Sequence, residues 1–122
     1  MESALFMQST KEMAGILEIF AGDTSKLMYA VGDCHVTALG GRSRMVGTLL
    51  GRGYSLEEAL EQLKGQTLES VVIAKRLGCA VKTLAAAGKV DANQFPLLMH
   101  VHDLLEGKDK VNIPWEKFEI IL

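Results

Sequence analysis

The stretch Gly40-Gly41-Arg42-Ser43-Arg44-Met45-Val46-Gly47-Thr48-Leu49-Leu50-Gly51-Arg52-Gly53 holds a short apolar helical pattern between two pairs of glycines. Gly40 and Gly41 permit backbone conformations that are closed to other residues, so they predict a turn. The apolar residues after that turn recur at helical spacing: Met45, Val46, Leu49 and Leu50. This pattern predicts a helix that ends at Gly51-Arg52-Gly53. Helices separated by glycines are the expected plan of the chain.

Two more helices are expected before this stretch. One apolar stripe, with residues at i, i+3, i+4 and i+7, consists of Met13, Ile16, Leu17 and Phe20, and it stops at Gly22. The side chains of residues 23–25 (Asp-Thr-Ser) are suited to cap a second, short helix with the apolar run Leu27-Met28-Tyr29. Gly32-Asp33 is expected to form a turn.

Capping residues and glycines delimit two helices downstream. Ser55 followed by Glu58 is a capping-box signature, and that helix is expected to continue to Gly65. A longer helix is expected over residues 68–87, with Gly88 as its stop. Its inward residues are expected to be Leu68, Val71, Val72, Leu77, Val81 and Leu84. The Val-Val-Ile run by itself also fits a strand, but the helical spacing that follows and the alanine-rich end favour a helix.

Prolines mark the last two predicted helices. Pro96 suits the first position of a helix that Gly107 terminates. Pro114 is expected to start a short last helix that carries Trp115, Phe118 and Ile121. The sequence therefore predicts an all-α fold, and 122 residues are enough for one domain with a core of its own.

Composition and charge exclude several classes of protein. Hydrophobic residues make up 48% and charged residues 23% of the chain, which is typical of a globular protein. The formal net charge of −2 favours binding neither to nucleic acid nor to an anionic membrane. The two cysteines, Cys34 and Cys79, show no pairing pattern and indicate reduced thiols in a cytoplasmic protein. No signal peptide or long apolar run is present, so neither secretion nor membrane spanning is expected.

The glycine turn and the arginines after it predict an anion site. The free N–H groups and the dipole of a helix start favour negative charge, and the Arg42 guanidinium can hold a phosphate through two hydrogen bonds. Arg44 points to another side of the helix, where it is equally suited to pair with a carboxylate. Asp33 is expected to bring a carboxylate to the same cleft. Recognition of a phosphate together with hydroxyl groups is the expected function.

The histidines and Cys34 are expected to be structural or to lie at the surface. His100 and His102 are two residues apart, which places them roughly 200° apart around a helix, so they cannot share one metal ion. His35 is close to Asp33 in sequence, but side chains so close on a helix or strand usually diverge. Cys34 is expected to be a buried free thiol. No metal site is predicted.

Several segments, taken in order, resemble the substrate-binding part of NAD(P)-dependent sn-glycerol-3-phosphate dehydrogenases. The family pattern has Gly-Asp, Thr, Ser-Arg-Asn-Arg, Gly and Leu-Gly-x-Gly, followed by Gly-Gln-Val-x-Glu-Gly, Met-Pro-Ile and a terminal Glu-Gly segment. This chain has Gly32-Asp33, Thr37, Gly41-Arg42-Ser43-Arg44, Gly47, Leu50-Gly51-Arg52-Gly53, Gly65-Gln66-Thr67-Leu68-Glu69-Ser70, Phe95-Pro96-Leu97 and Glu106-Gly107-Lys108-Asp109. The resemblance covers residues 4–109.

The resemblance implies a helical domain similar to the C-terminal domain of 6-phosphogluconate dehydrogenases, and roles for particular residues. Asp33, Gly41, Arg42 and Ser43 would bind the substrate. Arg42, Thr67 and Glu69 would face the cofactor, NAD or NADP. A homo-oligomer is expected, with the apolar first helix as the associating surface. A role in glycerophospholipid metabolism is implied as well.

The nucleotide-binding fold and the catalytic lysine of that family have no counterpart in this chain. No Gly-x-Gly-x-x-Gly turn occurs, and no lysine is followed by asparagine. Residues 1–122 are therefore expected to be one helical substrate-binding domain of a longer enzyme, inactive by itself and without a catalytic residue of its own.

Two positions of the arginine motif depart from the family pattern. Gly41 replaces a serine and lacks its hydroxyl, although its N–H remains, and Ser43 replaces an asparagine and lacks its reach and its amide. The motif therefore predicts the architecture of the cleft more firmly than the identity of the substrate. Two alternatives stay open: a non-catalytic helical binding module, or the helical domain of a dehydrogenase for another phosphorylated or carboxylated hydroxy compound.

Overall fold

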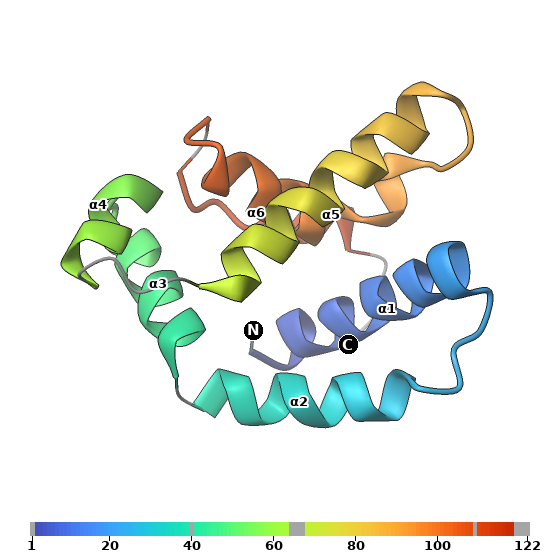
Figure 1. Cartoon of the computed structure of the whole chain (residues 1–122), viewed down its shortest axis with the longest axis horizontal. Coiled ribbons are helices and arrows are strands. Elements are labelled where there is room, and N and C mark those ends of the chain that lie inside the picture. Colours follow the sequence, from blue (N-terminus) through green and yellow to red (C-terminus); the bar gives the residue numbers. More distant parts are fainter. Residues whose placement is uncertain (1, 40, 64–67, 109, 119–122) are drawn as a thin grey trace.

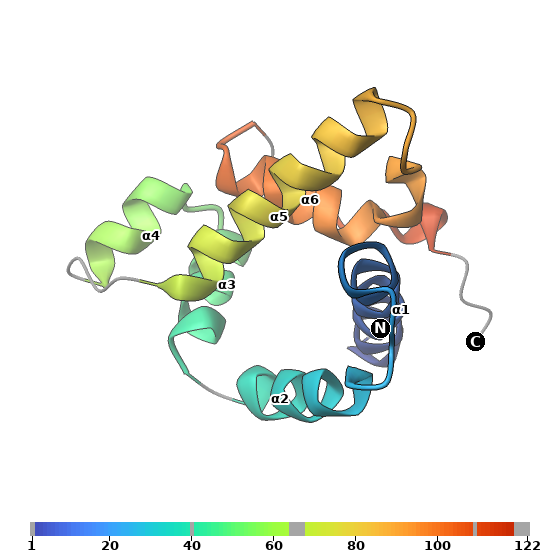
Figure 2. The same ribbon diagram turned by 45° about the vertical axis from the view of Figure 1, so that its right-hand side comes forward.

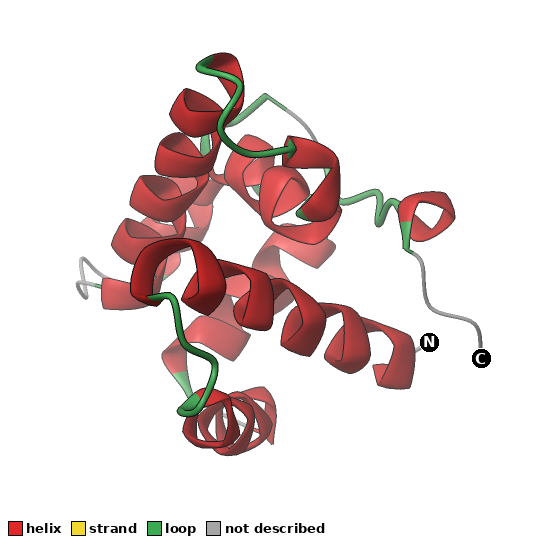
Figure 3. Ribbon diagram, turned by 90° about the vertical axis from the view of Figure 1, so that its right-hand side faces the viewer, coloured by secondary structure: helices red, strands yellow, loops and turns green. Residues whose placement is uncertain are grey.

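The computed structural model describes residues 2–39, 41–63, 68–108 and 110–118. It contains six α-helices and two single turns of 3-10 helix, and no strand within the described residues. The α-helices are α1 (Glu2–Ala21), α2 (Leu27–Leu39), α3 (Arg42–Gly51), α4 (Leu56–Gln62), α5 (Glu69–Ala86) and α6 (Pro96–Leu105), and the 3-10 turns are η1 (Ala92–Gln94) and η2 (Trp115–Lys117). The all-α class is confirmed (Figures 1 and 3).

The helices follow one another around a ring (Figure 2). α1 packs beside α2, α2 leads into α3, and α3 packs against the short α4. α5 then packs along α6, and α6 returns to contact α1. This order brings the start of α5 next to the start of α3, although the two are far apart in the chain (Figure 2).

Helix ends are where glycines, proline and the capping box predict them. α1, α5 and α6 end just before Gly22, Gly88 and Gly107, whose positive φ angles of 67°, 74° and 74° suit glycine. Pro96 is the first residue of α6. Both hydrogen bonds of the capping box of α4 are present, since Ser55 Oγ accepts from the Glu58 N–H and Glu58 Oε1 accepts from the Ser55 N–H.

The expected turn at Gly32-Asp33 is wrong, because both residues lie inside α2. A single glycine in a helix costs only about 1 kcal/mol relative to alanine, which packing of the helix easily outweighs. The neighbours favour the helix too, since Leu27, Met28 and Ala30 are good helix formers. α2 is therefore longer than the sequence pattern predicts.

A buried apolar cluster joins α3, α4, α5 and α6. Its core consists of Val46, Leu56, Leu68 and Leu105, and Leu50, Leu60, Leu63, Val71, Ala74 and Val101 pack around it. The expectation for Val72 is wrong, because 39% of this residue is exposed while Val71 packs on the cluster. Successive helical residues are about 100° apart, so a core on one side of α5 receives Val71 and leaves Val72 outside.

A polar joint connects α1 to the start of α6. The buried Glu12 carboxylate accepts hydrogen bonds from the N–H groups of Leu97 (2.9 Å) and Leu98 (2.8 Å) in the first turn of α6. The buried Gln8 amide donates to Glu12 Oε2 at 2.7 Å. Phe95, which is 1% exposed, packs on Gly15 of α1. These contacts close the ring of helices.

The predicted short last helix is a single 3-10 turn, Trp115–Lys117. The rings of Trp115 and Phe118 meet edge to face with centroids 5.6 Å apart. Ile121, Gly40 and Gly65 lie outside the described residues. Among the helices that the structure describes, none combines the length and the apolar character needed to cross a membrane.

Candidate functional site at the starts of helices α3 and α5

The predicted glycine turn and the helix after it are present. Gly41 precedes α3 with φ 100° and ψ 180°, a conformation that favours glycine, and Arg42 is the first helical residue. No described side chain caps this helix start. The N–H groups of the first turn, which have no partner within an α-helix, therefore remain available to a ligand.

The first turn of α5 lies against the first turn of α3 (Figures 1 and 2). Ser43 Oγ and Ser70 Oγ are 2.7 Å apart, a hydrogen bond in which either hydroxyl can donate. α5 also begins without a side-chain cap among the described residues. Two helix starts, each with a partial positive charge, therefore meet at one place, which favours binding of an anion.

The buried cluster explains why the two helix starts meet. Val46, one turn after Ser43, and Leu68, two residues before Ser70, belong to the same cluster. Packing of these two side chains holds the helix starts together and brings the hydroxyls into contact. Sequence reasoning missed Ser70, because nothing in the chain pairs it with a residue 27 positions away.

Arg44 has a structural role at the corner between α2 and α3. Its Nη1 donates a hydrogen bond to the Leu39 carbonyl oxygen at 3.1 Å. Leu39 is the last residue of α2, and a cation at a helix C-terminus interacts favourably with the helix dipole. The alternative of a carboxylate partner for Arg44 is therefore replaced by a backbone carbonyl, and the side chain fixes the corner that leads into the glycine turn.

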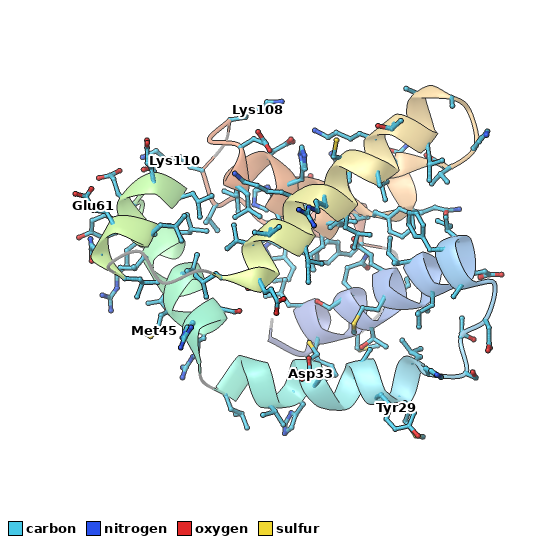
Figure 4. The ribbon with its side chains drawn as sticks, in the orientation of Figure 1. Tyr29, Asp33, Met45, Glu61, Lys108 and Lys110 are labelled. Atoms are coloured by element: carbon cyan, nitrogen blue, oxygen red, sulfur yellow. The ribbon has the colours of Figure 1, made fainter. Side chains whose placement is uncertain are left out.

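Arg42 and Asp33 are both exposed, and the structure does not join them. Among the described residues, no ion pair includes either side chain. Asp33 lies midway along α2, as Figure 4 shows, and six residues at 1.5 Å each separate it from the end of that helix by about 9 Å. Arg42 thus keeps its guanidinium available at the start of α3, while Asp33 is set back along α2.

Glu69 is the first residue of α5 and is exposed beside Ser70. A carboxylate there is favoured by the dipole of α5. Thr67, the other expected cofactor residue, lies outside the described residues. We call the place where the two helix starts meet, residues 41–43 and 69–70, the junction. It offers a guanidinium, two hydroxyls and backbone N–H groups as donors and one carboxylate as an acceptor. This set of groups is suited to a small, hydroxylated anion.

The histidines and cysteines lie away from this junction. His102 is buried against Gly78, with its Nδ1 3.5 Å from Asp103 Oδ1 and its Nε2 3.9 Å from Glu106 Oε1. His100 Nε2 accepts from the Asn112 N–H at 3.1 Å, and the His35 ring meets Phe6 edge to face. Cys34 is half-buried rather than buried, Cys79 is exposed, and both thiols are free. Within the described residues, no three His, Cys, Asp or Glu side chains gather closely enough to hold a metal ion.

Comparison with known proteins identifies the family. The family model for the C-terminus of NAD-dependent glycerol-3-phosphate dehydrogenase matches residues 1–116. The NADP(+)-dependent glycerol-3-phosphate dehydrogenase of Archaeoglobus fulgidus is 34% identical over 88 residues, which make up 70% of this chain. The matched segment is 25% of that relative, so the chain aligns with about a quarter of its length.

No solved structure matches the chain. The family model nevertheless covers nearly all of the sequence, including the glycine turn, the arginine motif and both helix starts of the junction. The chain belongs to the family of C-terminal domains of NAD-dependent glycerol-3-phosphate dehydrogenases.

Proposed function

We propose that residues 1–122 form the substrate-binding helical domain of an enzyme that interconverts sn-glycerol 3-phosphate and dihydroxyacetone phosphate with NAD or NADP. The family membership supports the reaction. The observation that carries the site is the meeting of two helix starts, neither capped by a described side chain, beside an exposed Arg42. A phosphate at that place gains from two helix dipoles and from a bidentate guanidinium.

Each residue of the site has a proposed role in holding the substrate. Arg42 holds the phosphate, with the Gly41 N–H and the Ser43 hydroxyl as further donors. Asp33 accepts hydrogen bonds from the hydroxyl groups of the substrate, which must extend from the junction toward α2 to reach it. The proton of the C2 hydroxyl is taken by a lysine supplied from outside this chain. The domain thus contributes positioning and charge complementarity.

The residues of the junction fit the nicotinamide end of the cofactor. Glu69 is able to accept a hydrogen bond from the carboxamide NH₂ group, and Arg42 or Thr67 to donate one to its oxygen. When bound, the cofactor supplies hydride transfer, which no side chain of this chain provides. A nicotinamide cofactor agrees with the NAD of the family description and the NADP(+) of the relative.

Weak binding of the substrate to the chain tests this proposal. We expect sn-glycerol 3-phosphate and inorganic phosphate to shift the amide NMR signals of Gly41 and of the first turns of α3 and α5, whereas glycerol does not. Arg42→Ala should weaken binding roughly tenfold or more, since a charge-assisted hydrogen bond is worth about 1.5–3 kcal/mol. Lysine at this position should restore only part of the loss, because a point charge cannot replace the planar guanidinium.

Arg52→Ala is the matched control for that experiment. Arg52 follows the last residue of the same helix and is exposed, so its loss changes the net charge equally but at the opposite end of α3. Binding by this variant should equal that of the wild type. If Arg52→Ala and Arg42→Ala weaken binding to the same extent, the anion responds only to net charge and the assigned site is wrong.

We further propose that the 122-residue chain by itself has no dehydrogenase activity. Its described part contains helices and loops but no strand, and so provides no parallel sheet for a dinucleotide. Mixing the purified chain with dihydroxyacetone phosphate and NADH or NADPH should leave the absorbance of the cofactor unchanged. Turnover that rises in proportion to the chain would contradict this assignment.

The two substitutions in the arginine motif favour a test of other substrates. Ser43 presents a hydroxyl where the family pattern has an amide, so a different phosphorylated or carboxylated hydroxy compound is the second candidate. A panel of such compounds in the same NMR titration separates the two. A panel member that binds tighter than sn-glycerol 3-phosphate makes the second candidate the better one. If no compound of the panel shifts the amide NMR signals, a non-catalytic helical module is the remaining candidate.

We also propose that the protein is cytoplasmic and self-associates. The most exposed of the large apolar side chains lie on α2 rather than on the expected first helix: Met28, Tyr29, Val36 and Leu39 are 83%, 77%, 68% and 69% exposed, against 47% for Met7 and 52% for Phe20 on α1. Sedimentation of a Met28→Glu, Leu39→Glu double variant beside the wild type tests the surface. A wild type that stays monomeric at high concentration contradicts self-association.

A further inference from the structure

We propose that Ser43 and Ser70 act as one unit, a hydroxyl pair that replaces the asparagine and glycine of the family pattern and determines which ligand group the junction accepts. This inference rests on the proposed function for its ligand. The pairing itself rests on the structure, where the two oxygens are 2.7 Å apart across α3 and α5.

The two hydroxyls are directed at each other by their positions in the helices. Thr10, Thr48 and Thr83 lie further along helices, and each donates to the carbonyl oxygen four residues earlier. Ser43 and Ser70 are each the second residue of a helix, so no carbonyl of the same helix lies four residues before them. Their hydroxyls therefore bond across the gap between the helices.

Both positions depart from the family pattern in complementary ways. Ser43 is shorter than the asparagine of Ser-Arg-Asn-Arg, and Ser70 is larger than the final glycine of Gly-Gln-Val-x-Glu-Gly. The amide lost at one position is thus matched by a hydroxymethyl group gained at the facing position. The combined change keeps a polar group between the two helix starts, whereas either change alone leaves a gap or crowds it.

The pair also changes what the junction offers to a ligand. An asparagine presents an NH₂ group with two donors, while two bonded hydroxyls present one free O–H and several lone pairs. The hydroxyl pair is able to accept from a ligand hydroxyl as well as donate to a phosphate oxygen. It therefore suits a ligand with a free hydroxyl next to its phosphate, such as a phosphorylated polyol.

A double-mutant cycle without ligand tests the pairing. Urea unfolding of Ser43→Ala, Ser70→Ala and the double variant should show a coupling of about two- to tenfold in the unfolding equilibrium constant, as expected for one hydrogen bond. Thr48→Ala combined with Ser70→Ala is the control and should be additive, because Thr48 bonds within its own helix. Additive effects of Ser43→Ala and Ser70→Ala overturn the inference.

Restoring the pattern tests the effect on the ligand. We expect Ser43→Asn and Ser70→Gly each to weaken binding of sn-glycerol 3-phosphate at least about threefold, and the double variant to return to within about twofold of the wild type. If the two single losses instead multiply in the double variant, the inference is contradicted. If the wild type does not bind this ligand at all, the proposed function fails, while the cycle in urea still decides the pairing.

Discussion

The start of α6 differs from the starts of α3 and α5 in what meets the first-turn N–H groups, which have no partner within an α-helix. At α6, the buried Glu12 carboxylate from α1 accepts the N–H groups of Leu97 and Leu98. At α3 and α5, no described side chain provides such a cap, and the exposed Arg42 adds a positive charge. The chain thus supplies its own anion to one helix start, whereas the other two have no side-chain cap among the described residues and are the place where we propose that an external anion binds. A helix start is informative about ligands only where the protein has not already satisfied it.

Breaking the internal cap should have the largest effect on stability. In Glu12→Gln, the carboxylate that receives two N–H groups and the Gln8 amide becomes a neutral amide with one acceptor oxygen. We expect the free energy of unfolding to fall by about 3 kcal/mol, because buried hydrogen bonds to a charged group are lost and donors are left unpaired. Urea unfolding measures this loss.

Glu18→Gln on the same helix is the matched control. Glu18 is exposed, and its carboxylate forms no hydrogen bond or ion pair with another described residue. The change should stay within about 0.5 kcal/mol. Equal losses for the two variants would mean that the cap at α6 contributes nothing special, and the contrast between the two helix starts would fail.

Two glycine substitutions compare the close contact of α5 with α6, the helix whose start is capped, with an open position on α3. A Cβ at Gly78 of α5 would lie 2.5 Å from His102 Cδ2 on α6, so Gly78→Ala should cost about 1–3 kcal/mol through overpacking. A Cβ at Gly47 of α3 would meet no described atom within 4 Å. Gly47→Ala should therefore stabilise the protein by up to about 1 kcal/mol. Thermal unfolding of both variants measures this difference in stability. If Gly78→Ala stabilised the protein, the close contact between Gly78 and His102 would be contradicted.

The capping box of α4 is an intermediate case, in which a helix start is satisfied by its own exposed residues. Ser55→Ala removes the hydroxyl that accepts the Glu58 N–H, and we expect a loss of about 1 kcal/mol in urea unfolding. Gln62→Ala, at the other end of α4 and exposed, should change stability little. A loss at Ser55 as large as that of Glu12→Gln would show that burial does not strengthen the cap at α6.

The smallest effect expected is a pH dependence of the contact between α5 and α6. The hydrogen bond from Lys82 Nζ, 2.8 Å away, lowers the pKa of Asp103 below its ordinary value of 3.8. A lowered folded-state pKa means that this stabilisation is present above the unfolded pKa and is lost as the pH falls through the folded pKa. Both side chains are about a third exposed, so the contribution should be below about 1 kcal/mol.

Asp103→Asn tests that contribution. The variant should be less stable than the wild type at pH 6, and the difference should shrink as the pH falls below about 4. Unfolding in urea at a series of pH values measures it. A difference that stays constant down to pH 2.5 would show that the loss comes from packing rather than from the charge of Asp103.

The ends of the helices were predictable from the sequence because they depend on local chemistry. Gly22, Gly88 and Gly107 adopt positive φ, Pro96 starts α6, and Ser55 with Glu58 caps α4. Each signal acts within a few residues of the chain. The exception is Gly32 with Asp33, where a local signal for a turn lost to the helix around it.

The site was predictable only in part. Gly41 and Arg42 predict a helix start that carries a cation, and the order of the motifs indicates the family. The partners across the fold were not visible: Arg44 bonds the end of α2, and Ser43 meets Ser70. Such contacts join residues whose sequence neighbourhoods carry no mark of each other.

By itself, the sequence determined an all-α chain, most helix ends, and a glycine turn followed by arginines. Only the tertiary structure decided that Val71 is inside and Val72 exposed, that Glu12 caps α6, and that the starts of α3 and α5 meet. The physical reason is the distance along the chain over which each kind of interaction acts. Capping and backbone preference act over about one turn of helix, whereas the side on which a helix is buried depends on where packing of the whole core places its neighbours.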